Sequence, residues 1–464
     1  MSKLVASAGD IRPMLGLALP VLAEESLTML VGYTDWWLAG HFLAGAQSKA
    51  AMGLMSYVMW LLPSLFSAVA IGATAMVSRF VGAGDRRTAT RVANQSLLIG
   101  IVLAAAAMVV VLAGGRHFVR WMQLENEAAA LSLRYIAIVV PAIPAIMVEQ
   151  VAAACLRGAG DSVSGFVAKS IVNVVNVVVS SLLVIGPGSI PNLGWDGLAI
   201  GTACGHGLGG LILFVLLLRG RAGLRLRRKE LKPDHDLIRR LTRVGLPGGL
   251  DVLAVLFCHL VYLAIINSLG TAAAAAHGLG VQIEALAYLP CVGFQVAAST
   301  MTGQFLGASD PRRATRAAIT TTAFGFGMLT VTACVFYFGG GVLAGFFTGD
   351  SHDATAQATA ALMKIVAYST PSLALVMVLT GALRGAGDTR WPLVISFVGL
   401  LGIRLPLSCI LAWDTVAIPG LDLAFAGWGM GVAGAWWAMV VDVVLRSGLV
   451  VFRFWQGGWR QLRV

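Results

Sequence analysis

The chain has 464 residues, of which 58% are hydrophobic and only 12% are charged. Soluble domains carry about 25% charged residues, so this composition excludes an ordinary soluble protein and predicts an all-α integral membrane protein. A formal net charge of +11 is compatible with nucleic-acid binding, but the placement of the basic residues, described below, argues against a nucleic-acid partner.

Apolar stretches of about 20 residues follow one another along the chain, and each is long enough to cross a bilayer as a helix. Many of them contain Gly or Pro, which spanning helices tolerate because neighbouring groups satisfy the freed backbone. We predict twelve transmembrane helices, at roughly residues 14–38, 51–78, 92–114, 131–154, 163–186, 195–218, 244–268, 277–301, 317–340, 358–381, 391–413 and 428–452.

The basic residues gather in every second loop between these spans. Four arginines surround the turn after the second span, and ten basic residues lie between Arg219 and Arg243. The loops on the other side are poor in Lys and Arg, and those around 341–357 and 412–427 are acidic instead. By the positive-inside rule both termini lie in the cytoplasm, and the basic loops face anionic membrane lipids as partners.

The second half of the chain repeats the first. LRGAGDS at 156–162 returns as LRGAGDT at 383–389, an offset of 227 at which three prolines also coincide. We predict two six-helix lobes, 13–219 and 244–453, joined by a basic cytoplasmic linker at 220–243. Because six is even, the lobes share one orientation and are related by pseudo-two-fold symmetry about an axis along the membrane normal, with a cleft between them. In each GAGD turn we expect Gly to allow the reversal, Asp to cap the next helix and Arg to contact lipid phosphates.

The repeated turn and several other segments resemble the multidrug and toxic compound extrusion (MATE) family of transporters. The resemblance covers essentially the whole chain. It implies a V-shaped pair of six-helix lobes that exports cationic or amphipathic compounds in exchange for H⁺ or Na⁺, in a bacterial cytoplasmic membrane. The segments that carry it, besides LRGAGD, are LALPVLAEE (17–25), GYTDWWLAGHF (32–42), VGLPGGLD (244–251) and AAHGLGVQIEALAYLP (275–290).

Asp35 lies deep in the first span and is the leading candidate for ion coupling. In the resembled family an acid at this place binds the coupling cation, and a protonatable carboxyl fits that role because burial favours its neutral form while a cation favours its ionised form. The alternative is an Asp in interfacial water near the helix end. The resemblance completes the site with Asn173, Asn176 and Thr202, and places Ser180 where the family often has a second Asp. Losing a carboxylate weakens a Na⁺ site (Asp35, Asn176, Thr202), so we favour H⁺.

A second group of residues is expected to face the cleft. Glu24 and Asp251 coincide under the repeat offset, each four residues after a Leu-Pro pair, and facing one another they would hold an organic cation. The equally weighted alternative is a bond to another helix within each lobe. Glu284 resembles an acid of one bacterial branch of the family. Aromatic side chains close to these charges offer flat faces to cationic drugs, although packing is the commoner role: Tyr33, Trp36 and Tyr288.

Several other polar residues inside the spans need partners. An arginine at membrane depth is normally paired, so Arg404 is predicted to form a structural ion pair, with Glu284 or Asp251 as the partner. The sequence suggests no partner for Glu149 or Asp442. His41, His206, His259 and His277 fall at spans or their ends; such a residue can carry protons but is more often packed and hydrogen-bonded.

These features predict a secondary active multidrug antiporter working by alternating access. We expect no enzymatic activity, no resident metal or cofactor besides the coupling ion, and no obligate protein partner. The chain has no G-x-x-x-x-G-K-[ST] motif, so nucleotide-driven transport by that route is not expected. A flippase for lipid-linked precursors is the main alternative, but its cleft should be basic. An intramembrane aspartyl protease would need two close aspartates at membrane depth, and a receptor or channel would not need the repeat.

Overall fold

The computed structural model describes residues 4–7, 9–43, 46–122, 126–350, 352–417 and 424–462, so part of the acidic loop predicted at 412–427 lies outside the described residues. The chain divides into two compact units. The N-terminal unit comprises Met1–Ala6 and Leu19–Gly249, and the C-terminal unit comprises Ser7–Ala18 and Leu250–Val464. The first helix therefore begins in one unit and continues in the other, as does the helix at the start of the second half.

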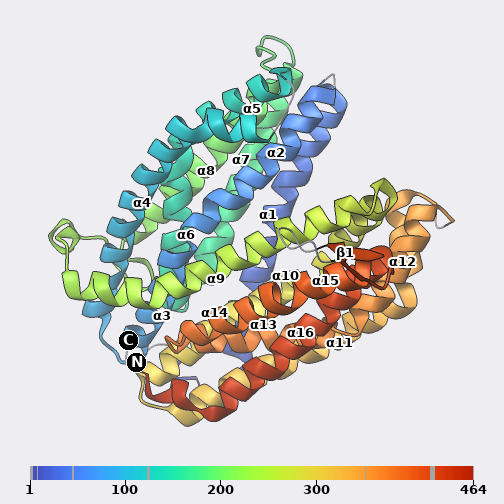
Figure 1. The fold of residues 1–464 in the computed structure, drawn as a ribbon. Coiled ribbons are helices and arrows are strands. Elements are labelled where there is room, and N and C mark those ends of the chain that lie inside the picture. The colour runs from blue at the N-terminus through green and yellow to red at the C-terminus, as the bar shows by residue number, and fades with distance from the viewer. Residues whose placement is uncertain are drawn as a thin grey trace. The chain divides into compact units, whose positions relative to one another are not determined.

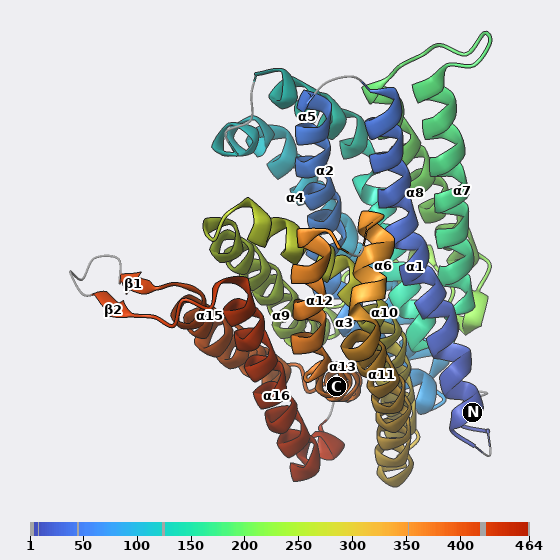
Figure 2. The ribbon, with the colours of Figure 1, turned by 90° about the vertical axis from the view of Figure 1, so that its right-hand side faces the viewer.

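The N-terminal unit is a bundle of six spans, visible in blue to green in Figures 1 and 2. Two of the spans are built from consecutive helices, and the most extensive packing within the unit is between α7 and α8. Its helices are α1 (Ile11–Phe42), α2 (Ala46–Leu65), α3 (Ser67–Gly82), α4 (Arg86–Trp121), α5 (Asn126–Val139), the 3₁₀ turn η1 (Val140–Ala142), α6 (Ile143–Gly158), α7 (Val163–Ile185) and α8 (Trp195–Leu218).

The C-terminal unit follows the same order of spans. It also contains a short two-stranded ribbon, which Figure 2 shows extending from the connection between α15 and α16. Its elements are α9 (His235–Ser268), α10 (Thr271–Gly307), α11 (Pro311–Thr348), α12 (Ala354–Ala367), α13 (Thr370–Gly385), α14 (Arg390–Ser396), the π-helical segment η4 (Phe397–Arg404), α15 (Leu405–Ala412), β1 (Thr415–Ala417), β2 (Ala424–Ala426), α16 (Gly431–Gln456) and η5 (Gly458–Gln461).

Among the described residues, eleven helices are long and apolar enough to cross a membrane, and a bent pair makes up the twelfth span. That pair is α12 and α13, which meet at 55° next to Pro371. The equivalent span of the first half is interrupted at η1, between Pro141 and Pro144. Proline removes a backbone donor and clashes with the preceding turn, which explains both breaks. The prediction of an all-α membrane fold with twelve spans, six to each lobe, is confirmed.

All four Gly-Ala-x-Asp turns end a helix in the same way. The backbone N–H of Asp85 donates to the carbonyl of Phe80 at 2.9 Å, and the equivalent bonds at Asp161, Asp310 and Asp388 measure 2.8–2.9 Å. This six-to-one bond requires a left-handed residue just before the Asp. Gly84, Gly160 and Gly387 have φ of 80°, 93° and 88°, and Ser309 adopts φ of 61° in the fourth turn. The repeated motif is therefore a helix stop.

The Asp of these turns also begins the next helix, as predicted, in three of the four cases. Asp85 and Asp310 accept the backbone N–H groups of Thr88 and Arg313 at 2.9 Å, and Asp161 accepts that of Ser164 at 3.1 Å. The hydrogen bonds from Thr88 lower the pKa of Asp85. In the fourth turn Asp388 instead pairs with Arg453, 2.8 Å away.

The region predicted as the linker, 220–243, is packed against α4 of the N-terminal unit. Short 3₁₀ turns at Arg221–Gly223 and Arg228–Leu231 precede α9, which begins at His235. The Gln95 side chain donates to two backbone carbonyls of this region, both at 2.8 Å. Arg91 forms ion pairs with Asp234 at 2.5 Å and Glu230 at 3.5 Å. The buried side-chain amide of Gln95 needs hydrogen-bond partners, and the linker backbone supplies them. We therefore infer that these bonds fix the conformation of the linker.

Candidate functional site

Asp35 is buried inside the N-terminal unit, on α1, with 3% of its surface exposed. Its Oδ2 accepts a hydrogen bond from Thr202 Oγ1 on α8 at 3.4 Å. Thr202 in turn is bonded to Asn176 Nδ2 on α7 at 3.2 Å and to Tyr135 Oη on α5 at 3.1 Å. Four helices thus bring one carboxyl, one amide and two hydroxyls to a single point. Among the described residues Asp35 has no ion-pair partner.

This site has acceptor capacity that the described protein does not use. Asp35 Oδ1, Asn176 Oδ1 and Ser180 Oγ are buried atoms without a hydrogen-bond partner in the described part of the chain. Buried oxygens of this kind are costly unless they are satisfied, so they mark a place where a proton, a cation or water binds. A single carboxylate with neutral oxygens suits a proton, or a weakly held monovalent cation, better than a divalent ion.

The predicted coupling residues come together only in part. Asp35, Asn176 and Thr202 form one bonded group, as just described. Asn173 is buried on the same helix but its Nδ2 donates to the carbonyl of Lys169 at 2.9 Å, one turn away from the group. Ser180 lies fully buried against Gly201 of α8, where a side chain at position 201 would collide with its hydroxyl. Tyr135 joins the group and was not predicted, because nothing in an isolated apolar span distinguishes a site tyrosine from a packing one.

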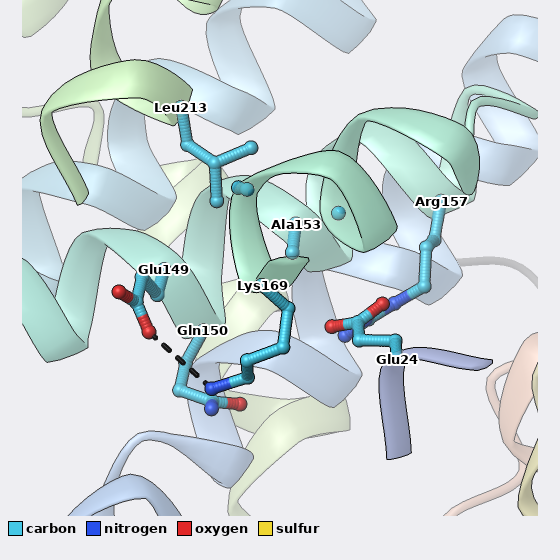
Figure 3. Close-up of a pocket in the computed structure, with 9 residues that line it drawn as sticks. Glu24, Glu149, Gln150, Ala153, Arg157, Lys169 and Leu213 are labelled. Carbon is cyan, nitrogen blue, oxygen red and sulfur yellow. Dashed lines mark hydrogen bonds and ion pairs between the residues drawn. The ribbon is translucent and has the colours of Figure 1, made fainter. Parts of the chain in front are cut away.

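Glu24 and Asp251 each form an ion pair inside their own unit. Arg157 Nη1 lies 3.1 Å from Glu24 Oε1, and Figure 3 shows the two side chains directed toward one another. Arg384 Nη2 lies 2.5 Å from Asp251 Oδ2, and Asp251 is 2% exposed. Both arginines belong to the repeated LRGAGD motif. Each half of the chain thus contains an acid–arginine pair whose two residues are 133 positions apart in the sequence.

These pairs bear on two predictions. For Glu24 and Asp251, holding an organic cation across a cleft was weighed equally with a bond to another helix of the same lobe, and the structure shows the second: a guanidinium from the same unit pairs with each carboxylate. The motif arginines were expected to contact lipid phosphates, but Arg157 and Arg384 are largely buried, with side chains 15% and 17% exposed. Buried charges of opposite sign pair because water is absent to stabilise them separately.

The partner predicted for Arg404 was wrong. Arg404 pairs with Asp442 on α16, with Nη2 and Oδ2 2.9 Å apart, rather than with Glu284 or Asp251. Arg446, one turn further along α16, contacts the same carboxylate at 2.7 Å. A side chain at Gly399, in the π-helical segment before Arg404, would collide with Asp442 and Arg446. The π-helical segment, which has an extra residue per turn, thus lies where the helix approaches α16 closely, next to the buried Asp442 carboxylate.

The other residues expected at a cleft lie at the surface of their units or partly within them. Glu284 on α10 is half-buried. Three aromatic side chains are exposed: Tyr33 by 51%, Trp36 by 42% and Tyr288 by 50%. Trp36 Nε1 donates to Ser56 Oγ on α2 at 3.0 Å, which fixes its ring. Exposure of large aromatics suits either lipid or ligand contact.

Two basic side chains inside the spans, Lys169 and Arg446, were not identified as site or core residues from the sequence. Lys169 Nζ on α7 lies 3.6 Å from Glu149 Oε2 on α6. His206 Nδ1 on α8 also lies within hydrogen-bond distance of Glu149, 2.9 Å from Oε2. Arg446 lies inside the last span and was overlooked. A long basic side chain near the end of a helix can extend one or two turns toward the middle of the span. Its position in the sequence therefore indicated that Lys169 could reach a buried carboxylate.

Comparison with known proteins decides the family. The sequence model of the MatE family matches residues 20–182 and 247–410, one match in each half. The chain belongs to the MatE family. The two matches coincide with the internal repeat, so each lobe of this MatE protein carries one copy of the family's structural unit. The predicted resemblance is confirmed.

Curated relatives and solved structures agree with this assignment. The MatE chain is 25% identical over 457 residues to "Probable multidrug resistance protein NorM" of Thermotoga maritima, covering 98% of the chain and 94% of the relative. It is 25% identical over 450 residues to "Multidrug resistance protein MdtK" of Pectobacterium atrosepticum, covering 96% and 95%. A solved structure described as the outward-facing conformation of a multidrug resistance MATE family transporter of the MOP superfamily superposes with a TM-score of 0.87 at 18% identity, covering 99% and 98%. At that identity the superposition shows the fold.

Proposed function

We propose that this MatE protein is a secondary active exporter of cationic or amphipathic compounds, driven by entering H⁺ and working by alternating access. The names of its relatives, which refer to multidrug resistance, support this class of cargo. The charge distribution of its loops supports a multi-pass protein of a bacterial cytoplasmic membrane with both termini inside.

The observation that carries the proposal is the buried Asp35 with its unused oxygen. Charged groups inside a span cost about 2.5–3.5 kcal/mol on insertion scales, so a buried carboxyl without an ion-pair partner is retained for function. When neutral it is tolerated by the apolar surroundings, and when ionised it attracts a cation. The proton binds when Asp35 becomes neutral, whereas an organic cation binds the N-terminal lobe when Asp35 is ionised. The two ligands therefore exclude one another, which is the requirement for antiport.

The neighbouring residues have distinct parts in this scheme. Thr202 holds the carboxyl in place by a hydrogen bond, and Asn176 and Tyr135 both bond to Thr202. Ser180 stands where the family often has a second carboxylate, and its neutral hydroxyl leaves the site with one acidic group. Hard cations prefer several charged oxygens, so this arrangement favours H⁺ over Na⁺ as the coupling ion.

The proposal is tested with the purified wild-type protein in sealed vesicles that contain a cationic dye. We expect an imposed pH gradient to drive dye against its concentration gradient, and a Na⁺ gradient of the same size at equal pH to give no more transport than empty vesicles. Transport driven by Na⁺ alone would replace H⁺ by Na⁺ in the proposal. Absence of transport with either gradient would remove the exporter function.

A further inference from the structure

A second cluster of titratable groups lies in the N-terminal unit. Glu149 on α6 contacts two basic groups: His206 Nδ1 at 2.9 Å and Lys169 Nζ at 3.6 Å. All three side chains are at most 13% exposed. Figure 3 shows Lys169 reaching Glu149 from the neighbouring helix. Three helices thus direct a carboxylate, an ammonium and an imidazole at one point, which is more than a simple ion pair needs.

The packing of α8 leaves space for this carboxylate. A side chain at Gly209 would collide with Glu149 Oε1 and with Val172. Glu149 Oε1 is itself buried and has no hydrogen-bond partner among the described residues. The glycine therefore admits a carboxylate oxygen that remains available as an acceptor.

Polar side chains lie between this cluster and Asp35, along α7 and α8. On α7, Lys169, Asn173 and Asn176 follow at intervals of four and three residues, which places them on one side of the helix. On α8, Thr202 and His206 are one turn apart. Seven residues of helix separate Lys169 from Asn176, a rise of about 10 Å. Asn173, between them, keeps an unpartnered buried Oδ1.

On its other side the cluster borders a pocket. The pocket has a volume of only about 20 Å³, enough for about one water molecule, and lies between Glu149 and the Glu24–Arg157 ion pair, with Gln150 and Lys169 in its wall (Figure 3). Arg157 ends its helix at the first LRGAGD turn, which the proposed topology places in the cytoplasm. The cluster thus stands between Asp35 and the inner end of the lobe.

We propose that Glu149, together with His206, is a second proton site that receives the coupling proton from Asp35 and releases it to this pocket. Chains of Asp, Glu and His within spans form proton relays in pumps and transporters. A proton leaves the Asp35 carboxyl as a proton is taken up by the Glu149 carboxylate or the His206 imidazole, so charge moves without any other reactant. Lys169 holds the ionised carboxylate, and the other charged groups around the cluster are Arg157, Glu24 and Glu25.

The inference rests on the proposed proton coupling through Asp35, so wild-type dye export driven by a pH gradient is the first measurement. If wild type exports no dye, the proposed function fails, and with it the relay. If wild type is active, Glu149→Gln is compared in two assays. One is export driven by the pH gradient. The other is exchange of labelled for unlabelled dye across the membrane at equal pH, which needs no net proton passage.

We expect Glu149→Gln to lower gradient-driven export by about tenfold or more and to leave dye exchange close to wild type. The matched control is Asp161→Asn, which removes an ion-paired carboxylate of the same lobe outside the helices, beside Arg221, and should leave both assays unchanged. Unchanged export by Glu149→Gln would overturn the relay. Equal loss of export and exchange would also overturn it, because that is the signature of a merely structural residue. Should Glu149→Gln not fold, His206→Gln, which keeps the carboxylate, is judged by the same two outcomes.

Discussion

Replacement of Asp35 by asparagine is expected to reduce export against a gradient strongly while the protein stays folded. Asparagine has the same shape and can still bond to Thr202, but it neither binds a proton nor carries a negative charge. Coupling between two ligands typically amounts to a factor of about 5–150, and we expect a loss of dye export in this range when a pH gradient is the only driving force. The measurement is the initial rate of dye movement in proteoliposomes.

The control for this variant is Thr202→Val, which removes the hydroxyl beside Asp35 but keeps the carboxyl. It should reduce export much less than Asp35→Asn, because the charge that distinguishes the two states of the site remains. Both proteins should elute as monodisperse species and melt close to wild type. Export by Asp35→Asn at the wild-type rate would mean that the coupling proton binds elsewhere.

Replacement of Asp442 by asparagine is expected to destabilise the protein strongly. Its carboxylate is fully buried and neutralises two guanidinium groups, those of Arg404 and Arg446. Removing one partner of a buried ion pair typically costs about 3–5 kcal/mol, because the remaining charge is left without compensation. For a domain of this size that corresponds to a fall of roughly 10 °C in the melting midpoint, measured in mild detergent by tryptophan fluorescence.

The matched control is Asp236→Asn. Asp236 pairs with Arg240 at the same four-residue spacing, 2.9 Å apart, but its side chain is 65% exposed. Exposed pairs contribute about 0.2–1 kcal/mol, so the midpoint should hardly move. Equal, small shifts for Asp442→Asn and Asp236→Asn would show that the buried charge cluster does not stabilise the C-terminal lobe.

Much of the fold could be predicted from the sequence because the hydropathy of each span identifies it without knowledge of its neighbours. Hydropathy identified twelve segments, and the offset of 227 identified two halves. Pro371 and Pro144, which lie beside the irregular segments of the two halves, are 227 residues apart. The position of this irregularity is therefore also repeated. The helices extend beyond the predicted spans, for example α9 to His235, because a helix continues into water where hydropathy no longer identifies it.

The charged groups were harder to predict, since pairing depends on which faces of the helices meet. Glu24 and Asp251 were correctly recognised as equivalent, but their partners, Arg157 and Arg384, were equivalent under the same offset and were assigned to lipid. Two residues that recur together with opposite charges are a signal for a pair within each half. By contrast, nothing in the sequence connects Asp442 to Arg404, because neither position has an ionisable equivalent in the first half.

The central claim, that a cation and a proton compete for Asp35, is tested most directly by proton release. Purified wild-type protein in weakly buffered detergent solution at mildly acidic pH is mixed with a saturating organic cation, and the change of pH is followed with an indicator dye. We predict the release of about one proton for each cation bound by wild type and none by Asp35→Asn. Cation binding to wild type without proton release, or equal release by Asp35→Asn, would contradict the account.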